Sequence, residues 1–263
     1  EDRGVTRACC LGMPFAVTHT RDDGRMVVVT AVRAETRAVL AALTRPTRIS
    51  IRGMRGWKGQ AGNRSVTLLQ AGVGPVRARA ALEALTAPYD LVVSIGFAGA
   101  LVTGASPGDV VLPDTVVWEE AVGLHRYAVP VGTWHTAKRQ LPADLAPRAL
   151  HGPILSSPVV VATPAAKHAA AIRVGAVAVE MEAAALVTVA CERGADVLVL
   201  RAILDSIDVS LEDLPPDLDS SWRARAQLMG RPRAWPGVLS LAYRIPHVAR
   251  ALTRATAAVL PAL

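Results

Sequence analysis

Three carboxylates follow two apolar runs of the chain, and their spacing suggests acid–base chemistry. Glu180 and Glu182 come directly after the short run 176–179, and Asp205 comes after the longer run 196–203. In open α/β sheets the carboxyl ends of the strands form the edge where ligands bind. Carboxyl groups there can hold hydroxyls, donate a proton or activate water. Helix capping or loop solvation is the simpler explanation that the spacing alone leaves open.

A strand–helix–strand unit would position these acids. Residues 176–179 have the composition of a short buried strand, and 182–193 consist mostly of strong helix formers. Gly194 follows where such a helix would end, and 196–203 predicts a second buried strand. We therefore expect the acids to lie at the ends of two strands of one sheet.

Two sequence motifs in this unit resemble a paired signature of a known family. Residues 179–185, VEMEAAA, followed by 200–206, LRAILDS, are similar to the purine and uridine phosphorylase superfamily, which includes the methylthioadenosine/S-adenosylhomocysteine nucleosidases. The resemblance implies that Glu182 holds the ribose hydroxyls and that Met181 packs on the sugar. It also implies that Asp205 protonates the purine ring as a general acid.

An acid at position 205 must carry a proton near neutral pH, where a free Asp is ionised. Holding it neutral requires about 4 kcal/mol of differential environment. Burial and like charge from Glu35 or Glu182, both expected to be ionised, act in that direction. Arg201 would act against it if the two were close, or would orient Glu35 instead. The resemblance places both Arg201 and Glu180 in the substrate site.

Glu35 is the candidate for activating the nucleophile. Residues 26–31 predict a first core strand and 35–43 predict a helix, so Glu35 lies near another strand end. In the nucleosidases this position holds the attacking water, and the resemblance implies the same role for Glu35. Arg33 and Ala34 stand where that family has two further acids. A first-turn glutamate that favours the helix dipole is the alternative.

Glycine-containing turns contribute further candidate site residues. Glycines in the turn 71–75 would let the backbone approach a ligand. A dinucleotide fingerprint is excluded because Arg77 occupies the position of its third small residue. In the family, this turn, the strand and glycine turn expected over 91–101, and the segment before the helix at 165–172 line the site. The substrate-site residues implied there are Gly74, Gly96, Phe97, Ala98 and Thr163.

The nucleophile is water or inorganic phosphate. Ser94 and Phe97 stand where phosphate-using relatives have Arg and Ser, and losing a bidentate Arg favours water. Phosphate as a co-substrate stays open, because Arg33, Arg77 or the basic hairpin predicted at 49–70 could hold it. We expect no cofactor other than this.

Composition excludes several classes of protein. Of the 263 residues, 51% are hydrophobic and 4% aromatic, so aliphatic side chains must build the core. The net charge of +7 comes from the end of the chain, where seven Arg and no acid follow Ser220. No nucleic-acid motif accompanies that charge. Three cysteines without metal-binding spacing predict a reduced, cytoplasmic protein without a structural metal.

We expect an α/β fold, a single-domain three-layer sandwich with a twisted mixed sheet and a C-terminal helical extension. The expected divisions are a flexible leader at 1–25, a nucleoside phosphorylase-like catalytic domain at 26–214 and a basic helical extension at 215–263. The extension reads as two helices broken at Pro232–Pro236. Its apolar positions at helical spacing are Leu239, Ala242, Ile245 and Ala249.

The extension also resembles the nucleoside phosphorylases associated with hopanoid biosynthesis, which act on a membrane lipid. A basic amphipathic tail could bind an anionic membrane surface, and a helix packed on the domain is the alternative. The overall expectation is cleavage of the N-glycosidic bond of a 5′-substituted adenosine. Candidates are adenosylhopane, methylthioadenosine and S-adenosylhomocysteine. The alternatives are a phosphate-dependent purine nucleoside phosphorylase and a non-catalytic nucleoside-binding protein, and the resemblance implies a homo-oligomer, with a dimer favoured.

Overall fold

A mixed β-sheet forms the centre of the molecule. The computed structural model describes residues 24–121, 123–211 and 235–263, so almost all of the expected leader lies outside it. Within the described residues the sheet has 11 strands, in the order β2-β3-β4-β1-β5-β10-β9-β7-β8, with β11 paired to β5 and β6. The strands are β1 (Arg25–Thr30), β2 (Thr44–Ile51), β3 (Met54–Ala61), β4 (Arg64–Gln70), β5 (Leu91–Ala100), β6 (Val110–Val111), β7 (Thr115–Glu120), β8 (Gly123–Ala128), β9 (Pro153–Ser156), β10 (Ala178–Glu180) and β11 (Asp196–Asp205).

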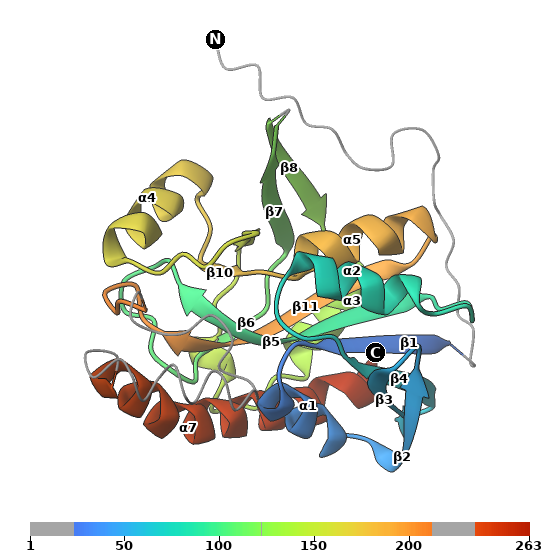
Figure 1. Cartoon of the computed structure of the whole chain (residues 1–263). Helices are drawn as coiled ribbons and strands as arrows, with labels where there is room; N and C mark the ends of the chain where they lie inside the picture. Colours follow the sequence, from blue (N-terminus) through green and yellow to red (C-terminus); the bar gives the residue numbers. More distant parts are fainter. Residues whose placement is uncertain (1–23, 122, 212–234) are drawn as a thin grey trace.

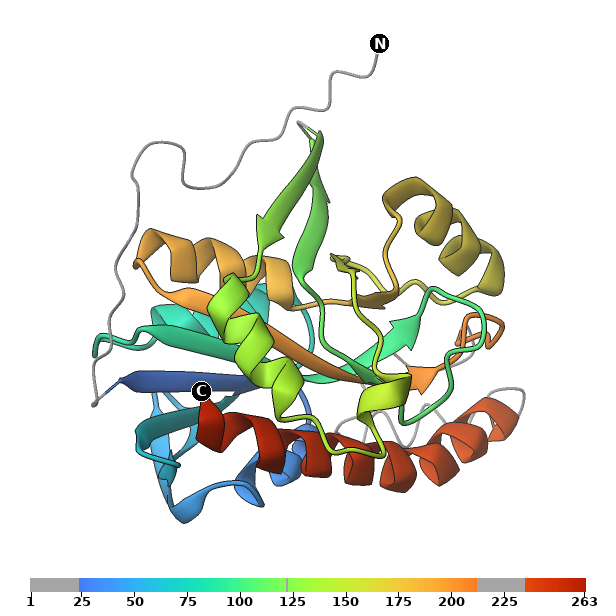
Figure 2. The same cartoon turned by 180° about the vertical axis from the view of Figure 1, so that it is seen from behind.

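Helices cover both faces of this sheet. They are α1 (Arg33–Leu40), α2 (Pro75–Glu83), α3 (Val131–Arg139), α4 (Pro164–Val174), α5 (Ala183–Glu192) and α7 (Trp235–Val259). Helices α1 and α7 pack together on one face, and α2 and α5 pack together on the other (Figure 1). The view from behind shows the same layers (Figure 2). The expected three-layer sandwich is confirmed.

The strands that carry the expected site are buried on both faces. Strand β5 pairs in parallel with β1 on one side and with β11 on the other. Both neighbours are runs of aliphatic residues, a composition typical of parallel strands covered by helices. Because parallel strands end at the same edge, the residues after β1 and at the end of β11 come close together.

The segment 49–70, predicted as a two-stranded hairpin, contains strands β3 and β4 and the end of a third strand, β2. The turn at 62–63 separates β3 from β4 as expected, but the first arm is itself divided into β2 and β3. Arg52 and Gly53 form the second turn, with φ angles of 48° and 81°. The Gly provides the left-handed conformation that such a turn needs, a signal that the basic composition of this segment obscured.

The C-terminal helix packs on the domain. Helix α7 begins at residue 235, within the expected break at 232–236, and continues through Pro246 to residue 259. Its buried positions include Val248, Leu252, Ala255 and Val259. The predicted Ile245 and Ala249 are partly buried, and the side chains of Leu239 and Ala242 lie outside the described residues. The other expected helix lies outside the described residues. Membrane contact through the tail stays a prediction, and none of the described helices is long and apolar enough to span a membrane.

The segment from β7 to α3 forms a projecting hairpin and a helix. Strands β7 and β8 extend away from the body of the molecule (Figure 1). Trp118 on β7 stacks on His125 of β8, with ring centroids 5.4 Å apart. Helix α3 follows and contacts α7. These aromatic residues therefore serve packing within the hairpin.

Candidate active site

A cavity of about 210 Å³ lies at the ends of β1, β10 and β11. Its polar lining consists of four acids that are far apart in sequence: Glu35, Glu180, Glu182 and Asp205. Its apolar lining includes Val73, Phe97, Val160, Met181 and Leu204. The carboxylates and apolar side chains thus surround one space of the size of a small ligand.

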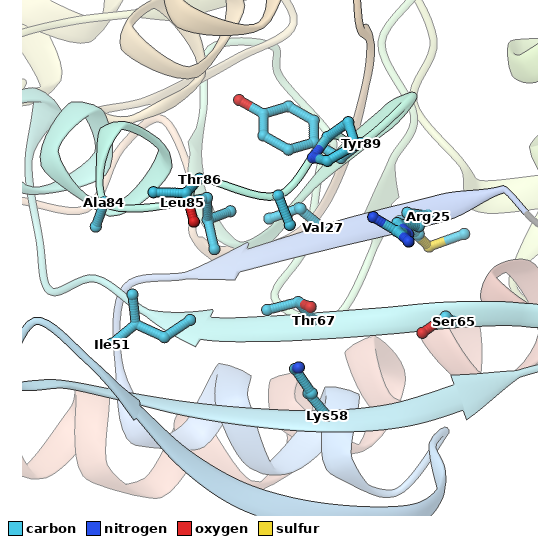
Figure 3. Close-up of a pocket in the computed structure, with 13 residues that line it drawn as sticks. Arg25, Val27, Ile51, Lys58, Ser65, Thr67, Ala84, Leu85, Thr86 and Tyr89 are labelled. Carbon is cyan, nitrogen blue, oxygen red and sulfur yellow. The ribbon is translucent and has the colours of Figure 1, made fainter.

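A larger cavity of about 470 Å³ lies elsewhere, between the sheet and the segment after α2. Arg25, Lys58 and Thr67 line it from three strands, opposite Leu85 and Tyr89 (Figure 3). None of its described lining residues is an acid, a histidine or a cysteine, and its Arg and Lys are exposed. Size therefore does not identify the reactive site, and the acid-lined cavity is the candidate.

Glu35 is positioned by backbone N–H groups. Its Oε2 accepts hydrogen bonds from Ala31 and Val32 at 2.8 and 2.9 Å, which closes the start of α1. Its Oε1 accepts one from Phe97 at 2.9 Å. Burial raises the pKa of Glu35, while these N–H groups and the charge of Arg201 oppose the rise. Both explanations of Glu35 are thus compatible, because the same carboxylate caps a helix and lines the cavity.

Gly96 allows this arrangement by having no side chain. A Cβ at position 96 would lie 2.8 Å from Glu35 Oε1 and 3.2 Å from Arg201 Nη1. Both distances are shorter than ordinary van der Waals contact. The glycine therefore lets two buried charged groups approach the same point of β5.

Arg201 and Glu180 form a buried ion pair behind the cavity. Arg201 Nη2 contacts the Glu180 carboxylate and donates to Ser94 Oγ at 2.8 Å. Glu180 also accepts the backbone N–H groups of Glu182 and Ala183 at 3.0 Å, so it caps the start of α5. This network fixes the turn from which the Glu182 side chain extends.

Glu182 joins two parts of the site. Its Oε1 accepts a hydrogen bond of 2.8 Å from Gly74, and its Oε2 lies 3.9 Å from Arg201 Nη2. Burial and the neighbouring charge of Glu180 raise the pKa of Glu182 to about 7. Burial and like charge thus oppose the ionisation that was expected of Glu182 in the unliganded site.

Asp205 is turned into the cavity by an irregularity of β11. The register between β11 and β5 shifts between Ile203 and Asp205, so Leu204 is an extra residue. The shift places both carboxylate oxygens over Gly99, where a Cβ would lie 3.2 Å from Oδ2. Burial raises the pKa of Asp205, in the direction expected of a general acid.

A lysine that sequence reasoning missed opposes this rise. Lys167 on α4 is fully buried, and its Nζ contacts Asp205 Oδ2. The same Nζ donates to the carbonyls of Ser206 and Val209 at 3.0 and 2.7 Å. A signal was present in the sequence, because Lys167 occupies the otherwise apolar face of α4. The spacing of that helix did not indicate which residue the lysine would meet.

The cavity unites most of the predicted site residues. Those that line it are Glu35, Phe97, Ala98, Glu180, Met181, Glu182 and Asp205. Four others do not line it, namely Gly74, Gly96, Thr163 and Arg201. Gly74 and Gly96 support its carboxylates, as described above. Thr163 caps α4 by accepting the N–H of Ala166 at 3.0 Å, and Arg201 holds Glu180 rather than Glu35 or Asp205.

The segment before α4 contributes different residues from those expected. Val159, Val160 and Val161 line the cavity, whereas the prediction placed Thr163 there. Leu211, whose N–H donates to the Ala162 carbonyl at 2.8 Å, closes the same side. The residues before α4 and those around Leu211 are irregular backbone, in which no periodicity indicates which side chains face the cavity. The prediction therefore missed the lining residues by a few positions.

The comparisons with known proteins agree with this arrangement. Residues 25–228 match the sequence family described as the phosphorylase superfamily. The fold is similar to that of the S-adenosylhomocysteine nucleosidase of Streptococcus pyogenes, with a TM-score of 0.73, 19% identity, and 92% of this chain and 98% of that chain covered. It is also similar to the 5′-methylthioadenosine/S-adenosylhomocysteine nucleosidase of Streptococcus pneumoniae, with a TM-score of 0.72, 20% identity, and 90% of this chain and 99% of that chain covered.

A futalosine hydrolase mutant of Helicobacter pylori is also similar, with a TM-score of 0.66, 18% identity, and 88% of this chain and 98% of that chain covered. At such identities the structural similarity shows a shared fold. The family match is independent of it and covers most of the chain, including every acid of the cavity. The chain is therefore an enzyme of the phosphorylase superfamily.

Proposed function

We propose that the chain cleaves the N-glycosidic bond of a purine nucleoside and releases adenine from a 5′-substituted adenosine. One observation carries the proposal: Glu35, Glu182 and Asp205, from three different parts of the chain, line the same cavity. Each can act on a different part of a nucleoside. A non-catalytic binding protein would have no need of buried acids whose pKa values are raised.

Asp205 is the general acid in this proposal. Cleavage leaves electrons on the purine, and a proton donated to the ring converts it into a better leaving group. Burial favours the protonated carboxyl group that this step requires. Leu204 and Val160 supply apolar surface on which a planar base can lie.

Glu182 orients the sugar. Its carboxylate can accept hydrogen bonds from the two ribose hydroxyls, and Met181 beside it offers apolar surface to the ring. The ionised form is the better acceptor, so nucleoside binding should draw Glu182 away from its protonated state. The N–H of Gly74 holds one oxygen of the carboxylate in place for this purpose.

Glu35 positions the attacking water. As the bond to the base breaks, positive charge develops on the sugar, and water attacks the anomeric carbon. Glu35 would accept the proton of that water, while Asp205 supplies a proton to the base. The products are then the free base and the free sugar, and one water molecule is consumed.

Water fits the charge of the cavity better than phosphate does. Of the described residues, no Lys or Arg lines this cavity, and four acids do. The two nearest cations, Arg201 and Lys167, already contact Glu180 and Asp205. A phosphate anion would meet no cation among the described lining residues and would lie beside acids, which is unfavourable in a buried site. This favours a hydrolase over a phosphate-dependent phosphorylase.

The 5′ substituent is the least determined part of the substrate. The solved relatives include a Helicobacter pylori nucleosidase mutant with 5′-methylthioadenosine in its active site. Val159 and Val160 beside the cavity are exposed, with 66% and 49% of their surface accessible, which suits an apolar group. Methylthioadenosine, S-adenosylhomocysteine and adenosylhopane are the candidates to be compared.

The test is release of free adenine from adenosine, methylthioadenosine, S-adenosylhomocysteine and an adenosyl lipid, each with and without inorganic phosphate. We expect release that does not depend on phosphate and free ribose derivatives as products. Strict dependence on phosphate with a sugar 1-phosphate as product would support the phosphorylase alternative. Binding of all the nucleosides without release of base would overturn the proposal.

A further inference from the structure

Lys167 contacts the proposed acid of the reaction without lining the cavity. All three of its N–H donors are directed to acceptors, namely Asp205 Oδ2 and the carbonyls of Ser206 and Val209. The side chain has no exposed surface, so it has no alternative partner in water. This side chain is therefore held in one position relative to Asp205.

We propose that Lys167 is a positioning residue that stabilises the carboxylate formed when Asp205 gives its proton to the leaving base. The inference rests on the function proposed above and extends it. Lys167 occupies Oδ2, which leaves Oδ1 as the oxygen available to a substrate. In the step itself, the O–H bond of Asp205 breaks, an N–H bond forms on the purine, and the negative charge left on Asp205 lies beside the ammonium group.

Such a partner is needed because burial alone would make Asp205 a weak acid. A carboxyl group in an apolar site keeps its proton, yet a general acid must also release it during the reaction. A fixed ammonium group favours the ionised product of the transfer and requires no rearrangement when the charge develops. Lys167 therefore allows a buried Asp to donate its proton near neutral pH.

The other charged groups around Asp205 do not replace this lysine. Arg244 on α7 also lowers the pKa of Asp205, with an effect smaller than that of Lys167. Glu35 and Glu182 lie across the same cavity and carry charge of the opposite sign. Lys167 is thus the main source of positive charge at the acid.

Lys167 also holds part of the cavity wall. Its bonds to the carbonyls of Ser206 and Val209 tie the segment after β11 to α4. In a purely structural role, Lys167 would hold this segment and would not affect the protonation of Asp205. The two roles differ in what they predict for the protonation of Asp205, and the test uses that difference.

Three substitutions separate the effect of the Lys167 charge from the effect of its hydrogen bonds to the Ser206 and Val209 carbonyls. Lys167→Met removes both, Lys167→Gln removes the charge but keeps N–H donors, and Lys167→Arg keeps the charge. Lys58→Met, on an exposed lysine of β3, is the matched control. In the Lys167→Met and Lys167→Gln variants, we expect the midpoint of the alkaline limb of the pH profile of kcat/KM to move to a pH about one unit or more higher. The plateau should fall at least about tenfold, because Asp205 becomes a weaker acid.

The Arg variant should keep the alkaline limb at the wild-type pH, and so should the Lys58 control. A second measurement does not depend on turnover: the carboxyl ¹³C signal of Asp205, assigned with Asp205→Asn, is titrated in the ligand-free protein. Its midpoint should rise in Lys167→Gln and Lys167→Met. If the wild-type enzyme releases no base from any nucleoside, the proposed function fails, while this titration still tests the role of Lys167.

If the folded Lys167→Gln and Lys167→Met variants show an unchanged Asp205 titration and an unchanged alkaline limb, the inference is overturned. Lys167 would then serve only to hold the segment after β11 against α4. If neither variant folds, the wild-type protein still decides. The chain has only three lysines, so the ¹⁵Nζ signal of Lys167 can be resolved. That signal should shift at the pH where Asp205 titrates, and independence of the two signals would contradict the proposal.

Discussion

Glu182 Oε1 accepts a hydrogen bond of 2.8 Å from the backbone N–H of Gly74, 108 residues earlier in the chain. The bond joins the start of α2 to the start of α5, and it holds a carboxylate whose pKa has risen to about 7. Gly74 has a φ of 100°, a conformation that an L side chain rarely adopts. The glycine thus presents its N–H to Glu182 without strain.

The pKa of Glu182 predicts how stability changes with pH. An unfolded Glu loses its proton near 4.5 and the folded Glu182 near 7, so the folded state becomes less stable as pH rises between these values. Glu182→Gln removes this dependence. We expect the variant to exceed the wild type in free energy of unfolding by at most roughly 3 kcal/mol at pH 8. The difference should shrink towards pH 5.

Urea unfolding from pH 5 to 8 measures this difference, with Glu83→Gln on the exposed side of α2 as the control. The same variant should bind nucleosides more weakly at pH 8, where the wild-type carboxylate is ionised. A pH-independent stability difference between Glu182→Gln and the wild type would show that Glu182 titrates normally.

Glu35→Gln should reduce both stability and turnover. The two oxygens of Glu35 accept three backbone N–H groups, from Ala31, Val32 and Phe97. A glutamine must direct its NH₂ group at one of these donors, and a buried unpaired N–H costs about 1–3 kcal/mol. The rate of base release should fall further than this loss of stability explains, because water activation is also lost.

Denaturant unfolding and single-turnover kinetics separate the two effects of Glu35→Gln. Nucleoside affinity, measured by calorimetry with adenosine, should change little in the folded variant. If the folded variant released adenine at the wild-type rate, Glu35 would be a helix cap only.

Asp205→Asn should abolish base release while the protein remains folded. Asparagine accepts a hydrogen bond from Lys167 but has no proton of suitable acidity to donate, so kcat should fall by roughly two to four orders of magnitude. At a pH where Asp205 of the wild type is ionised, the variant leaves the buried charge of Lys167 uncompensated, which should also lower the melting temperature. Circular dichroism at the assay temperature checks the fold, and Asp144→Asn on the surface is the control. Undiminished turnover would exclude Asp205 as the acid.

Local signals in the sequence indicated where the acids stand along the chain, and the family resemblance implied that they share one site. Glu180, Glu182 and Asp205 stand where apolar runs end. Strand β11 reaches the end of β5 by parallel pairing, whereas β10 meets that end by antiparallel pairing, an orientation that the apolar runs did not indicate. Burial of both strands on two faces made the runs recognisable. The sheet and its helical layers were predictable for the same reason.

The contacts between the acids and their cations depend on long-range packing. Arg201 meets Glu180 across 21 residues, and Lys167 meets Asp205 across 38 residues. No local periodicity encodes such pairs, because each partner is placed by a different element. The sequence therefore indicated where charge gathers, while the structure was needed to show which charges neutralise one another.

The last prediction concerns the C-terminal helix. Leu252 of α7 is fully buried and belongs to the same core cluster as Val93 and Leu200 of the central strands. Truncating a buried leucine leaves a cavity and typically costs about 2–5 kcal/mol. Leu252→Ala should therefore lower the free energy of unfolding of the whole domain in a single transition. Tyr243→Ala, on a side chain with 87% of its surface exposed, should change it by less than about 0.5 kcal/mol. Thermal and urea unfolding followed by tryptophan fluorescence measure both variants. A separate transition for α7, with the rest of the domain as stable as the wild type, would identify the helix as an independent extension.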